Sequence, residues 1–235
     1  MSDFKNQQKD HYKQLANKFD AEQNRDNRNH RNKIFAISDF LDIKENEKVL
    51  EVGIGTGIHA KYLLQLNKNF YFTGVDLSAD MLGEAQKKLK DFDNISLKEM
   101  DGENLDFEEG TFDKVYISGS LHHYPNPEKG ISEILRVLKK GGKFCIMEPN
   151  HLFPTNFIAA RRVEEEKNIR LMKVKNFKKW LSPHKDIKYK IINFAYTPPF
   201  PKFMLPFFNL ADKIIKYLYP LNKVSVMLFI CGQKN

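Results

Sequence analysis

Residues 49–57 read VLEVGIGTG, an apolar run that leads directly into three glycines spaced two residues apart. Glycine lets the backbone turn sharply and come close to a ligand, and a helix beginning near Ile58 would point its N-terminal N–H groups at any negative charge. This stretch therefore predicts a strand, a glycine-rich loop and a helix that together receive a nucleotide-like ligand.

Three further apolar runs are each followed by polar or small residues: 70–75 by Asp76, 95–98 by Asp101 and Gly102, and 112–117 by Ser118. Asp76 comes nineteen residues after Gly57, a spacing at which an acidic side chain at a strand end can accept hydrogen bonds from ribose hydroxyls. Because parallel strands end at the same edge of a sheet, we expect these side chains to face one crevice.

Strand-like and helix-like segments alternate from Lys48 to Met147, which is typical of a doubly wound, mostly parallel sheet with helices on both faces. The helices are expected at 58–66, 79–90 and 127–139. Ser78 is the expected N-cap of the second helix, and Gly141-Gly142 is expected to end the third.

Five ordered segments resemble the class I S-adenosylmethionine-dependent methyltransferases, in particular the small-molecule, ubiquinone- and menaquinone-like branch of methyltransferase type 11. They are residues 51–57, 74–78, 100–103, 112–115 and 133–142. The third glycine follows the second by two residues, which disfavours the Gly-x-Gly-x-x-Gly loop of dinucleotide-binding dehydrogenases. The resemblance implies a Rossmann-like α/β fold with seven strands, closed by an antiparallel hairpin at 187–195 and 224–232, and S-adenosylmethionine as cofactor.

The resemblance also implies which residues bind the methionine and ribose parts of this cofactor. Gly53, Gly55 and Gly57 would approach the methionine, and Glu51 would lie beneath the loop, holding either the loop or the amino group. Asp76 would hold the ribose. From the residues alone, Asp76 could instead cap the following helix.

The adenine would lie between apolar and polar residues that follow the second and third strands. By the resemblance, Leu77 and Met81 would pack on its faces, although both could equally be core residues at the start of a helix. Asp101 would accept the adenine amino group, Gly102 would support the ring edge through its backbone, and Ser118 would lie beside the methionine.

His122 and His123 follow the fourth strand, where the methyl group would be delivered. If the acceptor is a hydroxyl, a base must take its proton, and a neutral imidazole is suited to this near pH 7. The alternative is that the two rings only shape the pocket. Two adjacent histidines with no obvious third ligand do not indicate a metal site, so none is predicted.

The chain of 235 residues, 41% of them apolar, is long enough to bury one sizeable core. We predict a single methyltransferase domain with three parts: an N-terminal helical cap over 1–47, a cofactor-binding core over 48–150, and a lid with the C-terminal strands over 151–235. Cys145 and Cys231 lie in apolar runs and are expected to be buried core residues.

The first thirty residues are polar and contain no apolar signal-peptide segment, so a cytoplasmic protein is expected. The most apolar stretch, 203–210, is followed by Asp212, Lys213 and Lys216, and is too short to span a bilayer.

Residues 151–235 hold 16 of the 38 Lys and Arg residues but only five of the 30 Asp and Glu residues, and are also rich in aromatic side chains. One interpretation is a lid, built from 155–180 and 198–220, over an apolar or aromatic and perhaps anionic substrate. A second is peripheral contact with an anionic membrane surface. Nucleic-acid binding is disfavoured, because no recognised nucleic-acid module accompanies the charge.

Together these features predict methyl transfer from S-adenosylmethionine to oxygen or carbon of a small molecule, with a lipid, quinone or glycan precursor as candidate acceptors. The alternatives are methylation of RNA or protein, and a non-catalytic binding protein that retains the fold, because a fold does not by itself establish chemistry.

Overall fold

The computed structural model describes residues 5, 27–66, 69–194 and 225–235 of the chain. Seven strands form one sheet in the order β3-β2-β1-β4-β5-β7-β6. The strands are β1 (Lys48–Val52), β2 (Tyr71–Asp76), β3 (Ile95–Glu99), β4 (Phe112–Ser118), β5 (Leu138–Pro149), β6 (Ile187–Phe194) and β7 (Met227–Lys234). Strands β1 to β5 pair in parallel, and β7 runs antiparallel to both β5 and β6. This confirms the predicted seven-stranded, mostly parallel Rossmann-like sheet and its antiparallel hairpin.

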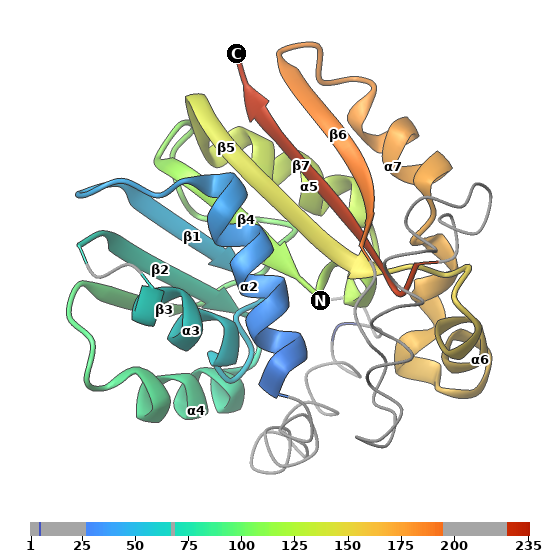
Figure 1. Cartoon of the computed structure of the whole chain (residues 1–235), viewed down its shortest axis with the longest axis horizontal. Coiled ribbons are helices and arrows are strands. Elements are labelled where there is room, and N and C mark those ends of the chain that lie inside the picture. The colour runs from blue at the N-terminus through green and yellow to red at the C-terminus, as the bar shows by residue number, and fades with distance from the viewer. Residues whose placement is uncertain (1–4, 6–26, 67–68, 195–224) are drawn as a thin grey trace.

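Helices cover both faces of this sheet, as Figure 1 shows for α2 and α3 in front of the strands and α5 behind them. The α-helices are α2 (Asn27–Leu41), α3 (Ile58–Leu66), α4 (Ala79–Leu89), α5 (Pro127–Val137), α6 (Pro154–Arg162) and α7 (Val174–Leu181). Two 3-10 helices, η2 (Leu121–His123) and η3 (Glu164–Leu171), lie between them. In the part of the chain that the structure describes, no helix has both the length and the apolar character needed to cross a membrane.

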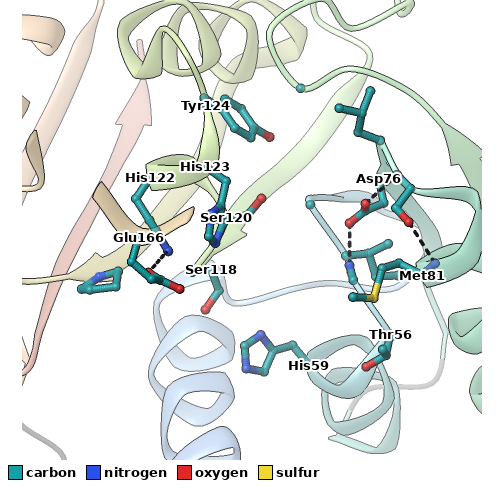
Figure 2. Close-up of a pocket in the computed structure, with 18 of the residues that line it drawn as sticks. Thr56, His59, Asp76, Met81, Ser118, Ser120, His122, His123, Tyr124 and Glu166 are labelled. Carbon is teal, nitrogen blue, oxygen red and sulfur yellow. Dashed lines mark hydrogen bonds and ion pairs between the residues drawn. The ribbon is translucent and has the colours of Figure 1, made fainter. Parts of the chain in front are cut away.

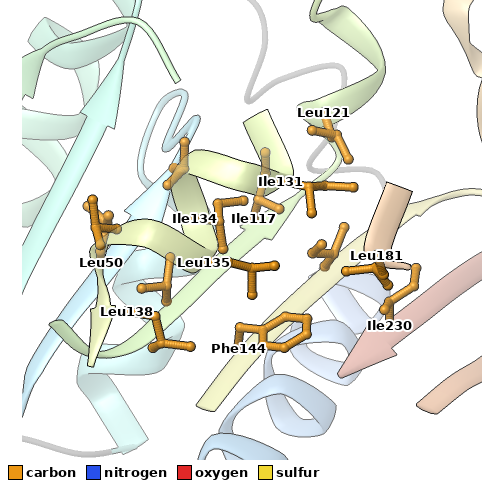
Figure 3. Close-up of a cluster of buried hydrophobic side chains, with 14 of the residues drawn as sticks. Leu50, Ile117, Leu121, Ile131, Ile134, Leu135, Leu138, Phe144, Leu181 and Ile230 are labelled. Atoms are coloured by element: carbon orange, nitrogen blue, oxygen red, sulfur yellow. The ribbon is translucent and has the colours of Figure 1, made fainter. Parts of the chain in front are cut away.

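The two faces of the sheet carry separate apolar clusters, because successive residues of a strand point to opposite sides. Val115 and Ile117 of β4 pack with α5 and α7, whereas Tyr116 between them packs with α2, α3 and α4. Figure 3 shows the first cluster, in which Phe144 of β5 is surrounded by residues such as Ile134 and Leu181. Helices thus cover the apolar residues of both faces, and the polar residues at the strand ends extend from this packed sheet.

The second and third predicted helices, 79–90 and 127–139, begin where predicted but end earlier, at Leu89 and Val137. Ser78 caps α4 as expected, since its Oγ accepts a hydrogen bond from the Met81 N–H at 3.3 Å. The prediction that Gly141-Gly142 ends the third helix is wrong, because α5 ends at Val137 and both glycines lie within β5. Leu138 is already extended and is paired with Phe112 of β4, so strand pairing ends this helix before the glycines.

The predicted lid and cap are partly core elements. Phe177 and Trp180 of α7 are buried in the cluster around α5, so the end of the segment 155–180 packs on the sheet. Ile34 and Ile37 of α2, which lies within the predicted N-terminal cap, are likewise fully buried. The predicted lid segment 198–220 lies outside the described residues.

Candidate functional site

A pocket of about 480 Å³ opens at the carboxyl ends of β1, β2 and β4, where the order of the strands reverses. Such a switch point is where open α/β sheets bind ligands. Ten of the residues singled out in the sequence line this pocket: Gly53, Gly55, Asp76, Leu77, Met81, Asp101, Gly102, Ser118, His122 and His123. Glu51 and Gly57 are not among the residues that line it.

The glycine-rich loop after β1 makes a wall of the pocket from its backbone. Gly53 and Gly55 have φ values of +71° and +55°, a region that L side chains rarely adopt. A Cβ atom at Gly53 would lie 2.0 Å from the Ser120 Oγ, whereas a Cβ at Gly55 would meet nothing within 4 Å. Gly53 is therefore required by the fold, and Gly55 leaves open space beside the pocket that a bound ligand could fill.

Gly57 and Glu51 instead support the loop from below. A Cβ at Gly57 would lie 3.2 Å from the Ala85 Cβ, so this glycine allows α3 and α4 to approach closely. Glu51 is buried in β1, where its Oε2 accepts a hydrogen bond from the Tyr116 hydroxyl at 2.8 Å. Burial raises the pKa of Glu51 to about 8, and the charge of Asp76 adds to this effect, while the Tyr116 hydrogen bond opposes it.

Asp76 ends β2 and fixes the loop that faces it. Its Oδ2 accepts a hydrogen bond from the Gly55 N–H at 2.8 Å, and its Oδ1 accepts one from the Ser78 N–H at 3.0 Å. Figure 2 shows this carboxylate beside the pocket, next to Met81. Each carboxylate oxygen can accept a further hydrogen bond, so Asp76 can hold the loop and a ligand at the same time.

Asp101 and Gly102 follow β3 and form the adjoining wall. The Nζ of Lys5 lies 2.6 Å from the Asp101 Oδ2, and the same ammonium pairs with Glu103. A Cβ at Gly102 would fall 1.9 Å from the Tyr124 hydroxyl oxygen, so only glycine fits beneath this ring. Lys5 thus pairs with both carboxylates of this wall, a contact that the sequence pattern did not indicate.

The opposite end of the pocket is built around His122. Its Nδ1 lies 2.6 Å from Oε2 of the buried Glu148, and its Nε2 lies 3.2 Å from Oε2 of Glu166 in η3. Burial alone would lower the pKa of His122, but the charges and hydrogen bonds of Glu148 and Glu166 outweigh it and raise this pKa to about 9. Figure 2 shows His122, His123 and Glu166 facing the pocket from the side opposite Asp76.

Some residues that line the pocket are not among the candidate site residues given above. Lys33 of α2 lines the pocket, and burial lowers its pKa to about 8, with partial compensation by Glu148. His59 of α3 also lines it, with its Nε2 2.9 Å from the Nδ1 of His30. The Ser118 Oγ is buried in the pocket wall and has no hydrogen-bond partner among the described residues, so it is available to a polar ligand.

Comparison with known proteins connects this pocket to one type of enzyme. Residues 50–146 match the model of the methyltransferase domain family. A segment of 104 residues is 36% identical to 2-methyl-6-phytyl-1,4-hydroquinone methyltransferase 1 of Oryza sativa subsp. japonica, covering 44% of this chain and 31% of that protein. Over 107 residues the chain is 38% identical to phosphatidylethanolamine N-methyltransferase of Cereibacter sphaeroides, covering 44% of this chain and 50% of that protein.

The fold is matched over nearly the whole chain. The crystal structure of a SAM-dependent methyltransferase from Thermotoga maritima superposes with a TM-score of 0.66 and 17% sequence identity. The match covers 95% of this chain and 98% of that one. The sequence matches, in contrast, span half or less of the length of the two curated relatives. Residues 50–146 of this chain are thus similar to the methyltransferase domain family, and the chain shares its fold with the Thermotoga maritima protein.

Proposed function

We propose that the protein transfers the methyl group of S-adenosylmethionine to a small-molecule acceptor, at oxygen or carbon. The observation that carries this proposal is that one pocket is lined by Gly55, Asp76 and Asp101 and also by His122 and His123. Figure 2 shows the two histidines on the side opposite Asp76. The pocket combines an open space over a glycine, two carboxylates at neighbouring strand ends and a separate polar end for an acceptor.

In this proposal the cofactor lies across the strand ends. Gly53 and Gly55 contact its methionine part, Asp76 accepts the ribose hydroxyls, and Ser118 donates to or accepts from the methionine end. Leu77 and Met81 contact the adenine, beside Asp101 and Gly102. Glu51 and Gly57 support the loop from outside the pocket, so we propose an indirect role for both.

An ammonium group and two imidazoles gather where the methionine part would lie. Lys33, His30 and His59 all line the pocket, on elements that pack beside the glycine-rich loop. Burial and the charge of Lys33 lower the pKa of His59, so Lys33 supplies the positive charge there. A carboxylate is favoured near such groups. We therefore propose that the methionine carboxylate lies on this side, which would leave the sulfonium methyl directed toward Ser118 and the two histidines.

The cofactor supplies an electrophilic methyl group, and the protein supplies alignment and exclusion of water. For a hydroxyl acceptor a proton must also leave, and His122 and His123 are the proposed catalytic residues at that end of the pocket. Because the pKa of His122 is raised to about 9, His122 is protonated near pH 7, and we propose His123 as the residue that accepts the proton. Glu148 has a positioning role, because it contacts the Nδ1 of the His122 ring. It also accepts hydrogen bonds from the backbone N–H groups of Ser120 and Leu121, at 3.0 and 2.9 Å.

The acceptor class follows from the relatives, which act by their names on a prenylated hydroquinone and on a phospholipid. We propose a lipid or isoprenoid quinone precursor. The assay is transfer of labelled methyl from S-adenosylmethionine to a demethylated isoprenoid hydroquinone, with phosphatidylethanolamine, whose acceptor atom is nitrogen, tested in parallel. Labelled hydroquinone supports transfer to oxygen or carbon. Label on phosphatidylethanolamine alone, or no product with either acceptor, contradicts it.

If the histidines act on the acceptor, His123→Ala is expected to lower turnover by about 10²-fold or more, with cofactor affinity unchanged. His122→Ala is expected to do the same. The control is His184→Ala, because this histidine contacts Ser132 and does not line the pocket. Normal turnover in both pocket variants would exclude a catalytic role for either ring.

We further propose that the rim of the pocket contacts a lipid surface. Leu152, Phe157 and Ile158 are 53%, 41% and 50% exposed on or beside α6, whose residues Asn156 and Ala159 line the pocket. Arg161 lies 3.5 Å from the centre of the Phe157 ring, so apolar and cationic groups are adjacent, as at membrane interfaces. The aromatic residues expected to do this at 203–210 lie outside the described residues.

Sedimentation with vesicles tests this contact. The wild-type chain is expected to pellet with vesicles of anionic phospholipid, and Phe157→Ser with Ile158→Ser is expected to reduce the bound fraction severalfold. The double variant Tyr71→Ser and Leu66→Ser changes exposed apolar residues away from the pocket and serves as control. Equal binding of both double variants would contradict the proposal.

A further inference from the structure

His122, His123 and Glu166 form a cluster of metal-ligating side chains at the acceptor end of the pocket. One nitrogen from each histidine and one Glu166 oxygen all lie within 4.8 Å of one another. The two histidines belong to η2 and the glutamate to η3, and the ring centres of the histidines are 3.9 Å apart. The sequence did not indicate this cluster, because its third member comes from a different element.

Glu148 orients His122 in the way that ligating histidines are usually held. Metal-bound histidine almost always donates its other ring N–H to a carboxylate or carbonyl, which fixes the tautomer and the ring orientation. The Nδ1 of His122 lies 2.6 Å from the Glu148 Oε2, and Glu148 is itself 0% exposed. Donation from Nδ1 to Glu148 leaves Nε2 facing Glu166, and an ion that displaces the Nε2 proton would bind its lone pair there.

The separation of these donor atoms suits neighbouring ligands of one ion. Zinc binds nitrogen and oxygen at about 2.0–2.2 Å, so two adjacent ligand atoms of one ion lie about 3 Å apart. The His122 Nε2 and the Glu166 Oε2 are 3.2 Å apart. This separation fits two ligands of one ion, and a nitrogen of His123 completes a set of three donor atoms within 4.8 Å of one another.

We propose that His122, His123 and Glu166 bind a divalent transition-metal ion of the Zn²⁺ type, with Glu148 holding His122 from behind. Two histidines and one glutamate are a ligand set of catalytic zinc sites, which keep a further position for water or substrate. All three residues line the pocket, so that position faces the space assigned to the acceptor.

The consequence for catalysis rests on the proposed function. A bound ion lowers the pKa of a coordinated hydroxyl. The acceptor O–H bond would break with its proton passing to solvent, and the oxygen would form its bond to the methyl carbon as the S–CH₃ bond breaks. The two histidines would then be ligands that act on the acceptor through the ion, in place of a direct base.

The test is metal binding by the full chain after removal of metals with a chelator. Titration with Zn²⁺, and with Co²⁺ followed by its visible absorption, is expected to give one equivalent bound per chain. Glu166→Gln and His123→Ala are each expected to weaken binding at least tenfold. The Glu166 side chain is 32% exposed, so its replacement should leave the fold intact, which circular dichroism would verify.

Glu165→Gln is the matched control, because it makes the same chemical change one residue away and Glu165 does not line the pocket. Unchanged binding in this control with weakened binding in Glu166→Gln supports the site. Equal affinity of wild type and Glu166→Gln would overturn it and leave His122 and Glu166 as an ion pair joined by a proton. No cofactor or acceptor is present in this titration, so its failure is distinguishable from failure of methyl transfer.

Discussion

Asp76→Ala is expected to weaken binding of S-adenosylmethionine by roughly ten- to a hundredfold, because hydrogen bonds to a charged group contribute about 1.5–3 kcal/mol. The carboxylate has two tasks in this account. It holds the Gly55 and Ser78 N–H groups, and it has capacity left for the ribose hydroxyls. Loss of the side chain would thus remove ligand contacts and loosen the loop that the cofactor needs.

Calorimetric titration of the variant with S-adenosylmethionine measures this effect. Asp80→Ala is the control, because Asp80 is an exposed acidic residue in the first turn of α4 and does not line the pocket. Asp76→Asn keeps one of the two acceptor oxygens and removes the charge, so it is expected to retain one of the two loop hydrogen bonds and to bind with an affinity between those of Asp76→Ala and the wild type. Wild-type affinity in Asp76→Ala would show that the cofactor lies elsewhere.

Glu148→Ala is expected to lower the free energy of unfolding by about 3–5 kcal/mol, because removing one partner of a buried ion pair leaves the other charge uncompensated. Glu148 is fully buried and accepts hydrogen bonds from the backbone of Ser120 and Leu121 and from the His122 ring. Its loss would also leave those two N–H groups without their acceptor.

Urea unfolding in the presence of a chelator measures this loss without a contribution from bound metal. Glu109→Ala removes a carboxylate whose side chain is 76% exposed, so it is expected to change stability by no more than about 0.5 kcal/mol. Glu148→Gln keeps an acceptor oxygen for the backbone N–H groups, so its loss of stability is expected to lie between those of Glu148→Ala and Glu109→Ala. A cost below about 1 kcal/mol for Glu148→Ala would contradict the proposed positioning role.

The alternation of strands and helices was predictable because its signals are local. The bounds of α3 are those expected from the apolar pattern after the glycine-rich loop, and Ser78 caps α4 through its own side chain. The end of α5 was not predictable in this way. Pairing of Leu138 with Phe112 is a contact between distant parts of the chain, and it overrides the local signal of Gly141.

The residues of the pocket also divide into those with a local sequence signal and those placed by tertiary packing. Residues at strand ends, such as Asp76 and Ser118, could be assigned from the sequence because parallel strands converge at one edge of the sheet. Glu166 and Lys33 could not, because they come from η3 and α2 and reach the pocket only through tertiary packing. Gly57 shows the opposite case, since its spacing indicated ligand contact and its position serves helix packing.

Whether the pocket binds S-adenosylmethionine is the claim on which the rest depends. Calorimetric titration of the wild-type chain with S-adenosylmethionine, and with its product S-adenosylhomocysteine, tests it most directly. The account predicts one site per chain with affinity in the micromolar range for both ligands. A folded chain that binds neither ligand would contradict the account and show that this fold serves a different function.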